Sequence, residues 1–173
     1  YLGLSKDISK EARMIETTVP PGARSKLVLP DSSTVHLNAG SRLTYASAFD
    51  DGIREVVLEG EGYFEVTSSE SCPFIVRTHN FTVRCTGTEF NIRAYSSEPE
   101  QSVTLIDGKV HVEIDDSRIA MNPNERMTIA QDGTRKITSG DPYRYYAWKN
   151  GELAFRNDRL EDVLKQLSDT YNY

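Results

Sequence analysis

The stretch Val56-Val57-Leu58-Glu59-Gly60-Glu61-Gly62-Tyr63-Phe64-Glu65-Val66 decides the fold class. Its apolar residues Val56, Leu58, Phe64 and Val66 fall at even positions. A period of two is typical of a strand with one buried and one solvated face. The two glycines share the apolar register, which indicates a bend or the close approach of another segment. The predicted solvated face carries Glu59, Glu61 and Glu65.

Short strand signals of this kind continue from Pro20-Pro21-Gly22 to about residue 138. Turn residues separate them, and Asp-Gly at 107–108 and 132–133 favours hairpins. Many short strands at this spacing indicate a sandwich or barrel. The sequence therefore predicts a mainly β protein, an antiparallel β-sandwich followed by a partial α+β domain. The predicted strands are 24–29, 34–38, 42–45, 53–58, 62–67, 73–78, 81–85, 89–95, 102–106, 109–114, 118–121, 126–130 and 134–138.

The pattern changes after Pro142. Residues 148–155 resemble one more strand, with Leu153 and Phe155 on a common face, and lead into a helix at 158–171. A capping box of Asp158 and Glu161 begins this helix. Its apolar residues recur at helical spacing, which predicts a core-facing stripe. The stripe consists of Leu160, Val163, Leu164, Leu167 and Tyr171.

These signals divide the chain into three parts. Residues 1–18 are a polar leader or linker, with at most a short helical turn around residues 12–15, and residues 19–140 form the β-sandwich domain. Residues 141–173 are a linker, strand and helix that begin a truncated C-terminal α+β domain. Because a lone strand and helix cannot bury both faces of a domain, this unit either packs on the β domain or has lost its remaining half. We favour the loss of that half.

Composition excludes several functions. The net charge of -6, without a cluster of Lys and Arg, argues against nucleic-acid binding. No apolar run approaches the length of a membrane span, and no signal-peptide pattern opens the chain. The first residue is Tyr1, so we expect a piece of a longer protein whose anchor lies elsewhere.

The two cysteines, Cys72 and Cys85, leave the redox compartment open. Pairing Thr78 with Phe81 in a hairpin puts Cys85 opposite Phe74 and diagonal to Cys72. A diagonal offset of about 7–8 Å lies at or beyond disulfide reach. We therefore expect free thiols, and a bridge only if the register slips.

The sequence offers no convincing catalytic or metal site. The histidines His36, His79 and His111 lie far from metal-ligand spacing and are expected to be solvated or ordinarily packed. The glutamates of the opening strand could suggest a glycosidase pair, but plain alternation favours a solvated face. No serine sits in a nucleophile elbow. We expect no enzyme activity, no metal and no cofactor.

Aromatic residues gather at 143–148, just before the predicted last strand. Interdomain packing is the first interpretation, contact with a partner protein the second, and a platform for sugars the third. The candidate partner-binding residues are Tyr143, Tyr145, Tyr146, Trp148, Leu153 and Phe155.

Seven stretches, taken in order, resemble the periplasmic region of FecR-family anti-sigma factors. Residues 29–41 are similar to the family's Leu-Pro-Asp-Gly-Thr-x-Val-x-Leu-Asn-x-x-Ser, and residues 58–66 to its Gly-Glu-Ala-Tyr-Phe-Glu-Val. Ser32-Ser33 departs from the family's glycine turn, which leaves the tightness of that turn open, and Gly62 replaces the commoner Ala. The other matching stretches are 19–24, 73–76, 87–92, 103–110 and 148–155.

The resemblance implies a fold and a role. The β region of the family is a jelly-roll-like sandwich, and the C-terminal domain of Bacteroidetes members resembles the short domain of secretins and TonB-dependent receptors. Family members add a cytoplasmic anti-sigma segment and one transmembrane helix, so this chain would be the periplasmic region of a single-pass inner-membrane protein. It would sense the signalling domain of a TonB-dependent outer-membrane transducer and control an extracytoplasmic-function sigma factor through the cytoplasmic segment.

Two points stay open at this level. The docking contact is expected at residues 148–155 by strand addition, which uses main-chain hydrogen bonds. The alternative function is that of a carbohydrate-binding β-sandwich module, which would expose two or three aromatic rings on one face.

Overall fold

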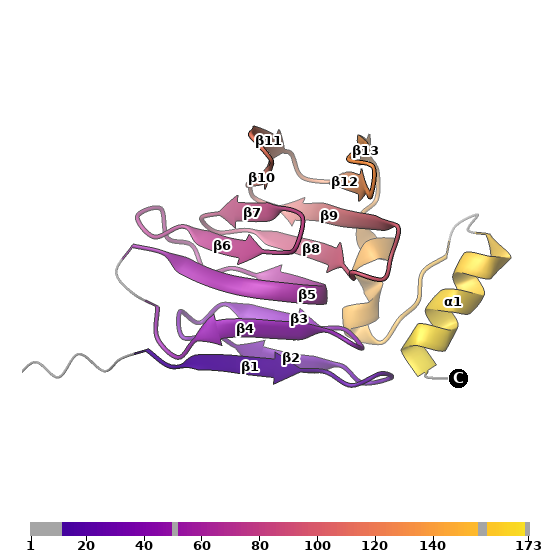
Figure 1. The fold of residues 1–173 in the computed structure, drawn as a ribbon, viewed down its shortest axis with the longest axis horizontal. Helices are drawn as coiled ribbons and strands as arrows, with labels where there is room; N and C mark the ends of the chain where they lie inside the picture. Colours follow the sequence, from indigo (N-terminus) through magenta and orange to yellow (C-terminus); the bar gives the residue numbers. More distant parts are fainter. Residues whose placement is uncertain (1–11, 50–51, 156–158, 172–173) are drawn as a thin grey trace, which may run out of the picture.

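The computed structural model describes residues 12–49, 52–155 and 159–171 (Figure 1). The prediction of a mainly β protein with a small helical part at the C-terminal end is confirmed. The strands are β1 (Met14–Thr18), β2 (Ser25–Val28), β3 (Thr34–Leu37), β4 (Arg42–Ala46), β5 (Arg54–Glu65), β6 (Phe74–Arg77), β7 (Thr82–Cys85), β8 (Glu89–Ala94), β9 (Glu100–Asp107), β10 (Val110–Ile114), β11 (Ser117–Met121), β12 (Glu125–Ala130) and β13 (Arg135–Ser139). The helices are the 3-10 turns η1 (Tyr143–Tyr145) and η2 (Ala147–Asn150), and α1 (Leu160–Tyr171).

Strand β5 joins two halves of one curled sheet. Its first half pairs with β4 and β6, and its second half with β3 and β8. Half-sheet A contains β1, β4, β6, β7, β10 and β11, and half-sheet B contains β2, β3, β8, β9, β12 and β13. The pairing is antiparallel as predicted, except that β6 runs parallel to β5. This exception arises because the chain crosses from half-sheet B back to half-sheet A between β5 and β6.

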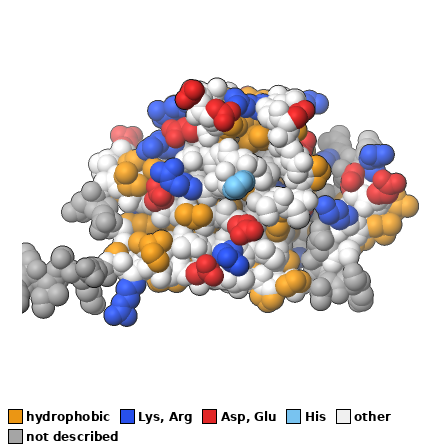
Figure 2. All heavy atoms as spheres, viewed as in Figure 1, with side chains coloured by type: hydrophobic (Ala, Val, Ile, Leu, Met, Phe, Trp, Pro, Cys, Tyr) orange, Lys and Arg blue, Asp and Glu red, His pale blue; other side chains and the backbone are white. Residues whose placement is uncertain are grey.

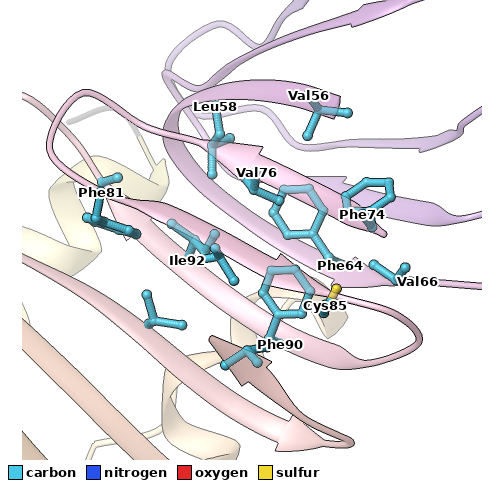
Figure 3. Close-up of a cluster of buried hydrophobic side chains, with 14 of the residues drawn as sticks. Val56, Leu58, Phe64, Val66, Phe74, Val76, Phe81, Cys85, Phe90 and Ile92 are labelled. Atoms are coloured by element: carbon cyan, nitrogen blue, oxygen red, sulfur yellow. The ribbon is translucent and has the colours of Figure 1, made fainter. Parts of the chain in front are cut away.

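The hydrophobic core lies between the two half-sheets. Figure 3 shows side chains from β5, β6 and β8 pointing toward one another. Phe64 of β5 stacks on Phe90 at 5.1 Å between ring centroids and meets Phe74 edge-on at 6.3 Å. The even positions of β5 are therefore buried, as the alternation predicts.

The two glycines of β5 are packing features. Gly60 has a φ of +96°, and a Cβ there would lie 2.8 Å from the Cα of Ser41. A Cβ on Gly62 would lie 3.0 Å from the ring of Phe64. Gly60 marks the place where β5 leaves half-sheet A and enters half-sheet B. Both glycines thus make room for a close neighbour.

Three predictions about local structure are wrong. Residues 14–18 form strand β1, paired with β4, and not a helical turn. The turn Asp107-Gly108 connects β9 of half-sheet B to β10 of half-sheet A, so it closes no hairpin. Residues 148–155 contain the 3-10 turn η2 and irregular chain instead of a strand. Gly151, with a φ of +80°, ends that turn.

The cysteine hairpin follows the predicted register. Strands β6 and β7 pair so that Cys85 lies opposite Phe74. Cys72 and Cys85 are both free. The expectation of two free thiols is therefore confirmed.

Candidate functional site

The C-terminal segment 142–155 packs against the outer face of half-sheet B. Tyr146 lies on Tyr63 of β5 with ring centroids 5.3 Å apart. The Lys149 ammonium lies 4.2 Å from the Tyr63 ring centroid and 3.4 Å from a carboxylate oxygen of Glu65. Trp148 is 4% exposed. Aromatic packing and cation–π contacts thus fix this segment on the sheet.

Glu61 is buried on the same outer face, at 3% exposure. Its carboxylate accepts hydrogen bonds from Asn38 Nδ2 at 2.9 Å and Asn91 Nδ2 at 3.0 Å, and Arg93 Nη1 donates at 2.7 Å. Arg93 also donates to both carboxylate oxygens of Glu98. The prediction that Glu61 lies on a solvated face is therefore wrong, because three donors from β3–β4 and β8 enclose it. Glu59 is exposed as predicted.

A cavity of about 400 Å³ lies between this face and the C-terminal segment with α1. Strands β5, β8, β9 and β12 supply its polar wall, which includes Glu61, Asn91 and Arg126. Trp148 and Phe155 supply part of its aromatic wall. The cavity is thus built by residues far apart in the sequence.

Arg126 is the most unusual side chain of the cavity. Its guanidinium lies 4.4 Å from the ring centroid of Tyr145, and its Nη2 is 3.6 Å from a carboxylate oxygen of Glu100. Burial, together with the neighbouring cations Arg144 and Arg93, lowers the pKa of Arg126 from its ordinary value. Among the described residues, the only carboxylate within ion-pair distance of Arg126 is that of Glu100.

Three buried polar atoms of the cavity wall have no hydrogen-bond partner among the described residues. They are Asn91 Oδ1, Arg126 Nε and Trp148 Nε1. A buried polar atom without a partner costs about 1–3 kcal/mol. Native structures contain few of them, so three in residues that line one cavity mark it as a candidate binding site, although none of the three atoms is itself exposed in the cavity.

Some of the sequence-predicted site residues pack on the sheet and others line the cavity, and Trp148 does both. Tyr146 and Trp148 pack on the sheet, and Tyr143 meets Tyr146 edge-on at 5.4 Å. Tyr145 and Phe155 line the cavity. Leu153 is half-buried in irregular chain, so it shares no strand face with Phe155.

Sequence reasoning missed the polar wall of the cavity. Arg93 and Glu61 are direct cross-strand neighbours, and Asn91 lies two residues before Arg93 on the same face of β8. A correct pairing of β5 with β8 would have brought these opposite charges together. The opposite charges of Glu61 and Arg93 are a usable signal, but the sequence alone does not show that β5 pairs with β8.

The apolar stripe of α1 is only half covered. Val163 and Leu167 are half-buried, whereas Leu160 is 72% and Leu164 56% exposed. The prediction of a core-facing stripe is therefore wrong for these two leucines. Figure 2 shows hydrophobic side chains at the outer end of α1, on the right. Asp158, the predicted capping residue, lies outside the described residues.

The described residues contain neither a metal-binding cluster nor a membrane-spanning helix. Within 12–49, 52–155 and 159–171, no group of three or more His, Cys, Asp or Glu side chains could hold a metal ion. His36 instead meets Tyr63 edge-on, and burial lowers its pKa. None of the helices in the described part of the chain has the length and apolarity to span a membrane.

Comparison with known proteins gives consistent matches. The sequence model described as "FecR protein" matches residues 15–111. Two crystal structures of a Parabacteroides distasonis protein, provisionally assigned as an anti-sigma factor, are similar at 34% identity. They superpose with TM-scores of 0.87 and 0.86, over 92% and 91% of this chain and 76% and 75% of theirs. No curated protein matches the chain significantly.

Proposed function

The chain belongs to the FecR family of anti-sigma factors, and from this premise we propose that it is the periplasmic sensor and relay region of a membrane-anchored anti-sigma factor. In this role it receives a signal from a TonB-dependent outer-membrane transducer and controls an extracytoplasmic-function sigma factor. In the proposed division, a leader precedes a β domain that includes strand β1 and extends to residue 140, and residues 141–173 form a C-terminal unit.

The observation that carries this proposal is the similarity to the Parabacteroides distasonis structures. It covers 92% of the chain, so it includes C-terminal residues as well as the β domain. At 34% identity, a shared fold and a related role are expected together. The transducer, the sigma factor and the periplasmic location are inferred from the family.

A relay needs a surface that a partner can cover. Leu160 and Leu164 lie one helical turn apart and therefore share one face of α1. Burying a leucine side chain on docking contributes about 1.5–3 kcal/mol. We call these two residues the α1 apolar face and assign it to the transducer's signalling domain. This contact replaces the strand addition expected at 148–155, because the structure has no strand there.

The aromatic contacts favour the relay over the carbohydrate-binding alternative. Trp148 is buried, and both Arg126 and Arg144 lie over the ring of Tyr145, at 4.4 Å and 4.8 Å. The ring of Tyr146 packs on Tyr63. A sugar platform needs exposed ring faces, and these rings are already engaged.

A binding measurement tests the proposal. The chain is titrated with the purified signalling domain of the proposed TonB-dependent transducer. We expect saturable binding that Leu164→Asp weakens by about tenfold or more, since it places a charge in an apolar contact. Val57→Asp is the matched control, because Val57 is an exposed apolar residue on half-sheet A. Absence of binding by the unmodified chain would overturn the relay function, and loss of binding only in Val57→Asp would overturn the assignment of the face.

A further inference from the structure

The 400 Å³ cavity has the size and chemistry of a small-molecule site. Pockets of a few hundred cubic ångströms suit small ligands, and a few convergent polar groups give them specificity. Here Asn91 and Trp148 are 2% and 4% exposed, and each carries a polar atom without a partner among the described residues. These buried groups belong to the cavity wall and take no part in the docking face of α1.

The donors of the cavity wall point to an anion. Two of the three atoms are N–H donors, Arg126 Nε and Trp148 Nε1. Arg93 is already held by Glu61 and Glu98, whereas the only carboxylate that Arg126 meets among the described residues is Glu100, at 3.6 Å from Nη2. The Nε–Nη2 edge of a guanidinium matches the two oxygens of a carboxylate. Glu100 approaches only one end of that edge, and half of its side chain is exposed.

The acidic groups of the same wall limit the charge of the ligand. Glu61, Glu98, Glu100 and Asp162 all line the cavity. Like charges repel strongly where water is scarce, so a dianion is disfavoured relative to a monoanion. Phe155, which is 39% exposed, and Ala154 offer apolar surface for the body of the ligand.

We propose that this cavity binds a small organic monocarboxylate. Its carboxylate displaces Glu100 from Arg126 and so reaches the Nε–Nη2 edge, whose Nε is covered in the structure, and its body lies against Phe155. The site is distinct from the proposed transducer contact and does not depend on it. Ligand binding here would brace the C-terminal segment against half-sheet B.

Trp148 makes the test direct, because it is the single tryptophan of the chain. The indole N–H signal is followed by NMR in ¹⁵N-labelled protein during titration with hexanoate, glucuronate, glucose or inorganic phosphate. We expect a saturable shift with hexanoate or glucuronate. A shift with glucose alone, a stronger response to phosphate, or no shift with either carboxylate would overturn the proposal.

Variants separate Arg126 from the rest of the wall. Arg126→Gln should weaken carboxylate binding by about tenfold or more, because it removes a charge-assisted hydrogen-bonded pair. Arg135→Gln is the matched control, since Arg135 also has a buried Nε without a partner among the described residues but lies outside the cavity wall. Glu100→Gln should tighten binding, because it removes the competing carboxylate.

A folding control distinguishes a loss of binding from a loss of the folded structure. If Arg126→Gln loses the dispersed spectrum of the folded chain, Arg126→Lys retains the charge and removes the planar fork. Weaker binding by a folded Arg126→Lys variant supports the proposal. Unchanged affinity in either folded Arg126 variant, or equal losses in the Arg135 variant, contradicts it.

Discussion

The hydroxyl of Ser41 clamps strand β5 at Glu61. It accepts a hydrogen bond from the Glu61 N–H at 2.8 Å and donates to the Glu61 carbonyl at 3.1 Å. Ser41 is fully buried. Its backbone lies so close to β5 that Gly60, the residue before Glu61, has no space for a side chain. The clamp therefore sits where β5 passes between the two half-sheets.

Gly60→Ala tests this clamp. The new Cβ would meet the Cα of Ser41 at 2.8 Å, and the φ of +96° adds backbone strain. Overpacking and strain together should lower the free energy of unfolding by about 2–4 kcal/mol in urea titrations. Gly133→Ala is the control, because Gly133 has a φ of +83° and nothing within 4 Å of a Cβ. Equal losses in the two variants would contradict the steric role of Ser41.

Ser32→Gly should stabilise the protein. Ser32 has a φ of +69° in a closed turn, in which its N–H donates to the Leu29 carbonyl at 2.9 Å. The turn is thus tight despite its departure from the family's glycine. Relief of left-handed strain should raise the free energy of unfolding by roughly 0.5–1 kcal/mol. Asn124→Gly, at a φ of +67°, should gain less, since Asn tolerates this conformation. A loss of stability in Ser32→Gly would count against the strain.

Arg54 forms an ion pair with Asp31, and Arg77 forms one with Glu55. Both have a 2.8 Å contact between nitrogen and carboxylate oxygen, so the two can be compared directly. Arg54 is buried and holds Asp31 together with the carbonyls of Thr67 and Cys72. Arg54→Gln should therefore cost about 3–5 kcal/mol of unfolding free energy, because it leaves the largely buried carboxylate of Asp31 without its counter-charge.

The exposed ion pair of Arg77 and Glu55 serves as the comparison. Half of the Arg77 side chain is exposed, so Arg77→Gln should cost no more than about 1 kcal/mol in the same urea titrations. Similar costs for the two substitutions would mean that burial does not decide the strength of these ion pairs.

Thiol reactivity provides a test of the core. Burial raises the pKa of Cys85 to about 12, so at pH 8 its thiol remains protonated and unreactive. Cys72 is half-buried. Iodoacetamide at pH 8 should label Cys72 in the folded protein and Cys85 only after denaturation, as followed by mass spectrometry. Labelling of both at the same rate in the native protein would be incompatible with the packing described.

The local pattern of β5 predicted a strand with one face in the core, but it did not predict which residues of the other face are buried. The even positions, including Phe64, are buried because alternation alone assigns them to the core. Glu59 and Glu61 have the same local pattern, yet only Glu61 is buried. The difference comes from Asn38 and Arg93, which lie more than 20 residues away and reach Glu61 only through tertiary pairing.

The C-terminal residues illustrate the same limit. The apolar alternation at Leu153 and Phe155 suggested a strand, but the turn at Asn150-Gly151 and the burial of Trp148 determine an irregular course. The aromatic cluster is visible in the sequence, whereas the polar wall with Arg126 requires the pairing of β9 with β12. Non-local pairing therefore accounts for most of what the sequence left open.

Site-specific photo-crosslinking tests the central claim most directly. A photoreactive residue is placed at Leu164 or, in a separate variant, at Val57 of the proposed membrane-anchored protein, and cells are irradiated with the transducer present. We predict that the transducer's signalling domain crosslinks at Leu164 and not at Val57. Crosslinks confined to Val57, or none at either position while the sigma factor still responds to the inducing signal, would contradict the account.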